Sequence, residues 1–195
     1  MNKKLILASR SPRRSELLEL ARIPFICEPS DIEEVMDESL PLNERIQQLA
    51  YQKALPIFEK HPDDIVLGAD SIVYIDNEVI GKPKDENDAR RILRKLSGRA
   101  HQVTTGVALV SKEEVELFSQ TSDVYFYELS EDEIEDYIAS NEWQGKAGGY
   151  AIQGYACKFI REIKGDYSNI VGLPIAMVYQ WLKNKKILWK IFQYI

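Results

Sequence analysis

The sequence is poor in the residues that most often act as nucleophiles or as soft metal ligands. Among its 195 residues there are two cysteines and two histidines. Cys27 and Cys157 lie far apart and outside any Cys-x-x-Cys spacing, which argues against a disulfide framework and predicts a reduced, cytoplasmic protein. We expect His61 and His101 at the surface or in packing rather than as metal ligands, and we find no Ser/His/Asp or Cys/His catalytic set.

Long apolar runs and an excess of basic charge are missing as well. No apolar run is long enough to cross a bilayer, and the short apolar run near the N-terminus does not form a secretory signal. The formal net charge of -6 argues against a surface that binds nucleic acid or an anionic membrane. We expect neither as a partner, so cations that bind an anionic ligand must be clustered locally. The oligomeric state is not fixed by these features, and a homodimer remains open.

What is present is an alternation of helical and strand patterns. Apolar residues at helical spacing predict a helix from about Leu42 to Glu59, and Asp85 is expected to cap another helix that ends near Leu96. Strands are predicted at 65–69, 72–75, 103–109, 115–127 and 159–163. Asp70 separates the first two. The sequence thus predicts an α/β fold, a mixed twisted sheet with flanking helices, in one compact domain with two lobes.

Two arginines occupy an unusual position after the first predicted strand. That strand ends before Ser9, Ser11 is a good N-cap, and Pro12 fits the first position of a helix. Arg13 and Arg14 then lie in the first helical turn, where the helix dipole disfavours cations by a few tenths to about 1 kcal/mol. An anion reverses that preference, because backbone N–H groups, serine hydroxyls and guanidinium groups all donate to phosphate. The pattern favours a phosphate site over two solvated arginines.

Asp70 is the sharpest catalytic candidate. A carboxylate inside an apolar strand is costly to bury unless it is paired, hydrogen-bonded or bound to a metal, although it could instead cap a turn at a strand end. Lys53 lies on the apolar face of its predicted helix, where it either extends to the rim of the core or meets a buried anion. Glu33 and Glu34 supply further carboxylates or form a solvated acidic turn. Carboxylates are hard ligands, so Mg²⁺ or Mn²⁺ fits better than zinc.

A glycine-rich stretch at 145–154 suits neither a helix nor a plain strand. Such a loop lets the backbone approach a ligand closely, and Lys146 and Gln153 offer a charge and an amide to a phosphate and a base edge. The alternative is a tight structural loop. The stretch is not a Walker A motif, and no Gly-x-Gly-x-x-Gly opens a helix after a strand. Together with Asp70 and the local cations, these residues match metal-assisted attack of water on a polyphosphate.

Five separated motifs occur in the order typical of one family. They are Leu7-Ala8-Ser9-x-Ser11-Pro12-Arg13-Arg14, Gly68-Ala69-Asp70-Ser71, Gly81-Lys82-Pro83, Lys146 to Gly154, and Gly165-Asp166-Tyr167 through Gly172-Leu173-Pro174. From Leu5 to about Tyr179 the chain resembles the Maf family, which is named for septum formation and includes nucleotide pyrophosphatases. The resemblance implies an elongated fold similar to inosine triphosphatase, with two lobes around a central cleft. It also implies hydrolysis of nucleoside triphosphates to monophosphate and pyrophosphate with a divalent metal.

The resemblance also implies roles for single residues. Asp70 resembles the family's proton acceptor and metal-linked carboxylate, and Glu34 resembles its metal partner, with Glu33 as the alternative. The phosphate-binding set that it implies is Ser9, Arg13, Lys53 and Lys82. The branch that acts on dTTP and UTP has its specificity positions at Arg13, Ser71 and Gln153. Residues 183–195 lie beyond the resemblance.

A second hypothesis keeps the same phosphate pocket and gives it another purpose. The chain could be a nucleotide-sensing or septum-associated binding protein whose hydrolysis is weak or incidental. A pure binder does not need a water-activating carboxylate, so Asp70 together with a nearby glutamate favours an enzyme. The substrate of that enzyme could be a standard pyrimidine triphosphate or a modified one.

Overall fold

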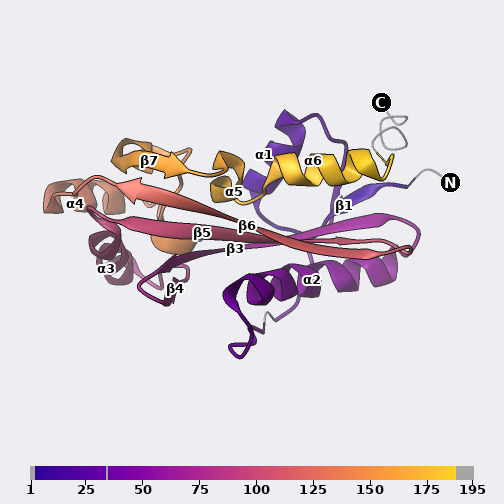
Figure 1. Ribbon diagram of the computed structural model, residues 1–195. Coiled ribbons are helices and arrows are strands. Elements are labelled where there is room, and N and C mark those ends of the chain that lie inside the picture. Colours follow the sequence, from indigo (N-terminus) through magenta and orange to yellow (C-terminus); the bar gives the residue numbers. More distant parts are fainter. Residues whose placement is uncertain (1–2, 34, 188–195) are drawn as a thin grey trace. The chain divides into compact units, whose positions relative to one another are not determined.

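The computed structural model describes residues 3–33 and 35–187 (Figure 1). Among these residues, a seven-stranded sheet runs in the order β2-β1-β3-β5-β6-β7, with β4 paired to β3 outside that path. The strands are β1 (Leu5–Leu7), β2 (Ile26–Cys27), β3 (Ile65–Ile75), β4 (Glu78–Ile80), β5 (Ala100–Val110), β6 (Val115–Phe126) and β7 (Ile160–Lys164). The helices are α1 (Pro12–Leu20), α2 (Leu42–Lys60), α3 (Glu86–Leu96), α4 (Glu131–Ala139), α5 (Tyr167–Val171) and α6 (Ile175–Asn184), with the 3₁₀ turns η1 (Ala147–Gly149) and η2 (Tyr155–Phe159). None of the helices in the described residues is long and apolar enough to span a membrane.

The sheet mixes parallel and antiparallel neighbours. β1 runs parallel to both β2 and β3, and Leu7 lies opposite Cys27 on one side and Leu67 on the other. β3 and β4 form an antiparallel hairpin through Asp76 and Asn77, which both have positive φ, as a two-residue type I′ turn requires. β6 pairs antiparallel with β7. The predicted mixed α/β sheet with flanking helices is confirmed.

The chain divides into two compact units. Unit 1 comprises Met1–Asp70, Thr105–Gln120 and Gly172–Ile195, and unit 2 comprises Ser71–Thr104 and Thr121–Val171. Strands β3, β5 and β6 each contribute residues to both units. Unit 1 therefore contains the candidates Ser9, Lys53 and Asp70, whereas Lys82 and Gln153 belong to unit 2.

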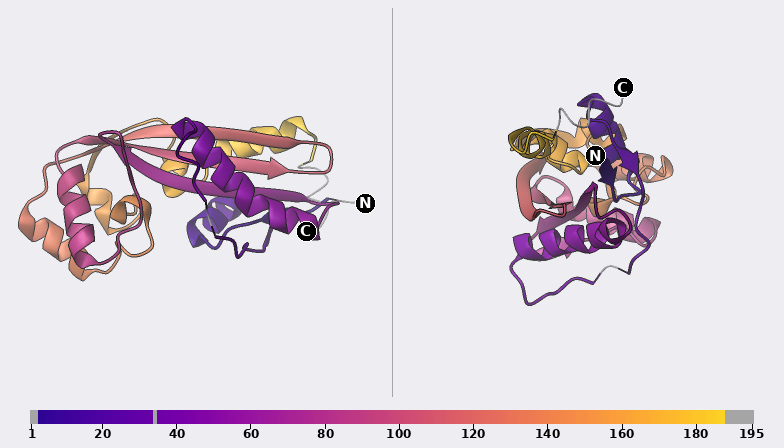
Figure 2. Two further views of the ribbon diagram at one scale, coloured as in Figure 1. Left: turned by 90° about the horizontal axis from the view of Figure 1, so that it is seen from below. Right: turned by 90° about the vertical axis from the view of Figure 1, so that its right-hand side faces the viewer.

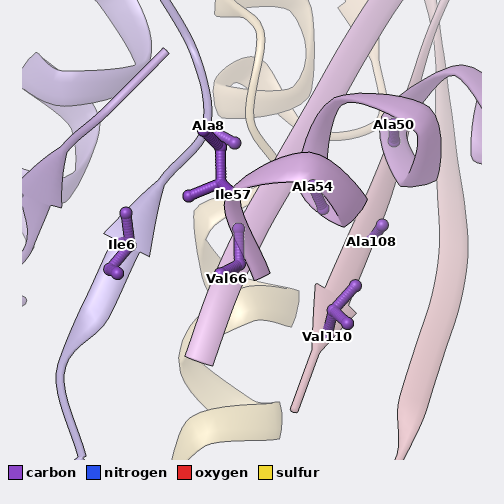
Figure 3. Packing of buried hydrophobic residues seen from close by; sticks show 8 residues of the cluster. All are labelled: Ile6, Ala8, Ala50, Ala54, Ile57, Val66, Ala108 and Val110. Atoms are coloured by element: carbon purple, nitrogen blue, oxygen red, sulfur yellow. The ribbon is translucent and has the colours of Figure 1, made fainter. Parts of the chain in front are cut away.

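In unit 1, helix α2 packs closely on one face of the sheet. A Cβ built on Gly68 of β3 would lie 2.1 Å from the carbonyl oxygen of Ala50, and one built on Gly106 of β5 would lie 2.3 Å from that of Ile46. Glycine at both positions therefore lets the backbone of α2 contact the two strands directly. Helices α1 and α6 lie on the other face of these strands (Figures 1 and 2). The apolar cluster between α2 and the strands contains Ile6, Ala8, Ala50, Ala54, Ile57, Val66, Ala108 and Val110 (Figure 3).

In unit 2, helices α3 and α4 pack against each other (Figure 2). Asp85 caps α3 as predicted, because its side chain accepts a hydrogen bond from the backbone N–H of Asp88 at 2.8 Å. A small aromatic cluster joins Tyr150 of the glycine-rich stretch to strands β5 and β6. The ring of Tyr150 lies edge-on to His101 and Phe126, with centroid distances of 5.4 and 5.0 Å.

One local prediction was wrong, and a second is confirmed in position only. Asp70 does not interrupt a strand: β3 runs without a break from Ile65 to Ile75, because the carboxylate meets a cation and does not need to leave the ladder. Ser11 stands at the N-cap position of α1, but its side chain makes no capping hydrogen bond. Its backbone N–H instead donates to Oγ of Ser9 at 3.2 Å, so this turn is built around Ser9.

Candidate active site

Lys53 of α2 and Asp70 of β3 form an ion pair in unit 1, in which Nζ of Lys53 contacts Oδ1 of Asp70. The two side chains are only 13% and 17% exposed. The packing of α2 on β3 accounts for this contact. Asp70 follows Gly68 by two residues and so points to the same face of β3, and Lys53 lies nearly one helical turn after Ala50, which touches Gly68. Of the two alternatives for Lys53, the structure shows the one in which it meets an anion.

Ser9 and Arg14 form a second cluster in unit 1. Arg14 is 8% exposed. Its Nε donates to the carbonyl oxygen of Gly172 at 2.8 Å, and its Nη1 donates to Oγ of Ser9 at 3.0 Å. The hydroxyl oxygen of Ser9 therefore accepts from both Arg14 and the N–H of Ser11, which leaves its own proton to be donated to an anion. Arg14 is thus not solvated: it holds Ser9 in place.

Arg13 lies in the first turn of α1. Its side chain is half-buried, and burial lowers the pKa of its guanidinium while the carboxylate of Glu16 raises it. The first turn of α1 carries no acidic residue. The positive end of the α1 dipole and the Arg13 guanidinium therefore favour an anion at this helix start.

The two clusters of unit 1 are linked by two neighbouring parallel strands, because Ser9 follows β1 and Asp70 lies in β3. Leu7 of β1 lies opposite Leu67 of β3, and the N–H of Ala8 donates to the carbonyl oxygen of Leu67 at 2.9 Å. Ser9 and Asp70 come two and three residues after this paired position. Ligands of open α/β sheets commonly bind at the carboxyl ends of parallel strands. The register therefore brings Ser9 and the paired carboxylate of Asp70 to the carboxyl end of β1.

Gln52 is a residue that sequence reasoning missed. Its Oε1 accepts from the N–H of Val35 at 3.1 Å, and its Nε2 donates to the carbonyl oxygen of Val35 at 2.9 Å. Gln52 therefore ties the acidic segment to α2, next to Lys53. Glu33 of that segment is exposed, and Glu34 lies outside the described residues. No local sequence pattern indicates this contact, because Val35 and Gln52 are 17 residues apart.

Carboxylates are the candidate ligands for a divalent cation. Within residues 3–33 and 35–187, no group of three or more His, Cys, Asp or Glu side chains is arranged to hold a metal ion. Lys53 contacts Oδ1 of Asp70, so Oδ2 can act as a ligand. A carboxylate oxygen suits a hard cation, and the donor chemistry fits Mg²⁺ or Mn²⁺. A role for Glu34 or Glu33 as the second ligand stays a prediction.

In unit 2, the segment that contains Lys82 lies against the glycine-rich loop. The carbonyl oxygen of Gly81 accepts from the N–H of Gly148 at 3.1 Å. A Cβ on Gly149 would lie 3.0 Å from Cγ of Pro83, and both loop glycines have positive φ. The glycines are therefore required for this contact, which brings Lys82 and the loop of Gln153 into one region of unit 2.

The remaining candidates of unit 2 differ in what they touch. Nζ of Lys146 donates to the carbonyl oxygens of Glu142 and Gln144, so its ammonium group holds the loop together. Lys82 and Gln153 are exposed, and Ser71 is half-buried.

His101 belongs to packing, as expected, and also anchors the loop. Its side chain is buried, and its Nε2 is 2.7 Å from the hydroxyl oxygen of Tyr150. Burial lowers the pKa of His101 to about 3 and raises the pKa of the Tyr150 hydroxyl. Both groups are therefore neutral near pH 7. Their partnership was not predicted, because 49 residues separate them.

These features define an α/β protein with a serine–arginine cluster at the start of its first helix and a lysine–carboxylate pair on a neighbouring strand. A family model described as "Maf-like protein" matches residues 4–185, and the chain belongs to this family. The resemblance drawn from the five motifs is thereby confirmed.

Similar proteins from other organisms match nearly the whole chain. A protein of Bacillus cytotoxicus named dTTP/UTP pyrophosphatase is 49% identical over 182 residues, which are 93% of this chain and 95% of that protein. A protein of Bacillus velezensis with the same name is 46% identical over 184 residues, or 94% and 97% of the two chains. The solved structure of the Staphylococcus aureus Ham1 protein has a TM-score of 0.45 and 16% identity, and covers 64% of this chain and 72% of that one.

Proposed function

We propose that this chain hydrolyses dTTP and UTP to the nucleoside monophosphate and pyrophosphate, with a divalent cation, Mg²⁺ or Mn²⁺, as cofactor. The names of relatives that share 46–49% of its residues over nearly its full length support the substrate and the reaction. The observation in the structure that carries the proposal is the Lys53–Asp70 pair beside the anion-binding start of α1. A carboxylate that accepts a proton and cations that bind phosphate are what such a hydrolysis needs.

In this mechanism Asp70 accepts a proton from the water that attacks the α-phosphorus. Lys53 holds the carboxylate in one position through its contact with Oδ1. Ser9 donates its hydroxyl proton to a phosphate oxygen, an orientation that Arg14 and the N–H of Ser11 impose. Arg13 adds positive charge for the leaving pyrophosphate.

Three further residues complete the proposal from unit 2. Lys82 is exposed and contributes a charge to the phosphates, while Ser71 and Gln153 contact the nucleoside. A bound divalent cation would be held by Asp70 with Glu34, or with Glu33 in its place. Such a cation supplies charge neutralisation on the phosphates.

The proposal is tested by incubating the purified chain with each standard nucleoside triphosphate and Mg²⁺ or Mn²⁺. Pyrophosphate and orthophosphate are assayed separately. We expect pyrophosphate from dTTP and UTP and little from the purine nucleotides. Release of orthophosphate alone would contradict the proposed reaction. Tight nucleotide binding without turnover would contradict it too, and would favour the nucleotide-sensing hypothesis.

A further inference from the structure

The side chain of Glu142 accepts hydrogen bonds from the loop backbone two residues after Gln153. Its Oε1 and Oε2 accept from the backbone N–H of Tyr155 at 3.0 and 2.9 Å. The N–H of Gly154 donates to the carbonyl oxygen of Ala151 at 3.1 Å, which closes a tight turn around Gln153. The carboxylate therefore fixes the end of the turn that displays this glutamine.

Gly154 leaves the space that this carboxylate occupies. A Cβ built on Gly154 would lie 2.1 Å from Oε1 and 2.6 Å from Cδ of Glu142. The φ of Gly154 is -109°, so its backbone does not by itself require glycine. The absence of a side chain at position 154 is therefore explained by the approach of Glu142.

Glu142 is itself held by the chain around it. Its backbone N–H donates to Oγ of Ser140 at 3.2 Å, and its carbonyl oxygen accepts from Nζ of Lys146. Below the turn, the ring of Tyr155 stacks on Tyr137 of α4, with a centroid distance of 6.0 Å and an interplanar angle of 6°. The carboxylate thus connects the turn of Gln153 to a well-anchored region of unit 2.

We propose that Glu142 is a positioning residue that sets pyrimidine selectivity by fixing the main chain beside Gln153. The inference rests on the proposed function, in which Gln153 meets the base. A carboxamide can both donate and accept, whereas uracil and thymine present an acceptor where cytosine presents an amino donor. A glutamine on a loosely held turn can adapt to either pattern, so discrimination depends on how firmly the main chain is held.

The test compares kcat/KM for UTP with kcat/KM for CTP. For Glu142→Ala we expect the UTP/CTP ratio to fall about tenfold, the size of effect that 1.4 kcal/mol produces. Glu142→Gln keeps an oxygen acceptor of the same reach and is expected to retain most of the ratio. Gln144→Ala, an exposed neighbour in the same segment, is the matched control and should leave the ratio unchanged. Unfolded protein lowers both values equally, so the ratio reports only folded enzyme.

A double-mutant cycle with Gly154→Ala sharpens this test. The added methyl group collides with the Glu142 carboxylate, so Gly154→Ala should lower the ratio through the same contact. The double variant should then be no worse than either single variant, because both changes break one interaction. Additive losses, or an unchanged ratio in Glu142→Ala when the wild-type chain hydrolyses UTP, would overturn the inference alone. A wild-type chain that releases no pyrophosphate from UTP or dTTP would overturn the proposed function and the inference with it.

Discussion

Unit 1 and unit 2 hold their candidate residues in different ways. In unit 1 the candidate side chains are shielded and bonded to one another, as in the Lys53–Asp70 ion pair and the contact from Arg14 to Ser9. In unit 2, Lys82 and Gln153 are exposed. Backbone contacts fix the positions of the loops that carry them. A side chain that moves a proton needs a fixed position, which shielded pairing provides. A side chain that recognises a ligand needs exposure, so the loop beneath it must supply the order.

The largest effect that this comparison predicts is at Asp70. Asp70→Asn keeps the shape of the side chain but removes the proton acceptor, so kcat for UTP should fall by about 10²–10⁴-fold. Nucleotide binding should remain, because the proposed phosphate contacts involve residues other than Asp70. Steady-state kinetics and equilibrium binding of UTP measure the two quantities. Asp63→Asn, an exposed carboxylate in the loop before β3, is the control, and equal turnover in the two variants would remove Asp70 from the mechanism.

A second prediction concerns the packing that carries Lys53 to Asp70. Gly68→Ala places a Cβ 2.1 Å from the carbonyl oxygen of Ala50, which should lower the free energy of unfolding by about 1–3 kcal/mol. Denaturant unfolding measures this change. Gly81→Ala is the matched substitution in unit 2, because a Cβ there meets nothing within 4 Å. The comparison between the units fails if both variants lose the same stability.

A third prediction uses the pH dependence of unit 2. Burial lowers the pKa of His101 from 6.5 to about 3, so between these values the unfolded chain binds a proton that the folded chain does not. Stability should therefore fall as pH drops below about 6.5, by about 2 kcal/mol at pH 5 from this residue. The His101→Gln variant has no imidazole at this position that the unfolded chain could protonate, while all other titrating groups remain. Its free energy of unfolding should change less between pH 7 and pH 5 than that of the wild type, and identical pH slopes would contradict the assignment.

The smallest effect is expected at Lys82, an exposed candidate residue of unit 2. Lys82→Ala should raise KM for UTP by about tenfold, since one charge-assisted contact to phosphate is worth about 1.5–3 kcal/mol and exposure weakens it. The melting temperature should not change. Lys84→Ala removes a second exposed lysine two residues away and serves as the control. Equal KM values for the two variants would contradict a specific contact between Lys82 and the phosphates. They would indicate that only the overall positive charge of this region affects substrate binding.

The sequence predicted those features that depend on neighbouring residues. The apolar spacing of α2 and the cap at Asp85 follow from local preferences, and the structure confirms both. Asp70 was identified because a carboxylate in an apolar run demands a partner, and Lys53 because it lies on an apolar helix face. Their pairing follows from the packing of α2 on β3. Lys53 lies nearly one helical turn after Ala50, Asp70 lies on the same strand face as Gly68, and Ala50 contacts Gly68.

The contacts that order the site could not be predicted from the sequence. Arg14 donates a hydrogen bond to the carbonyl oxygen of a residue 158 positions away. Gln52 contacts only the backbone of Val35, so the side chain of its partner gives no sign of the contact. Glu142 carries no pattern that distinguishes it from a solvated glutamate. Such partners are set by tertiary packing, which brings side chain and main chain together only once the sheet has formed.

The central claim is that water attacks the α-phosphorus of UTP and pyrophosphate leaves. The most direct test is hydrolysis of UTP in ¹⁸O-labelled water, followed by mass spectrometry of both products. The account predicts pyrophosphate without label and one labelled oxygen in UMP. Label in the pyrophosphate, or release of orthophosphate in its place, would contradict it.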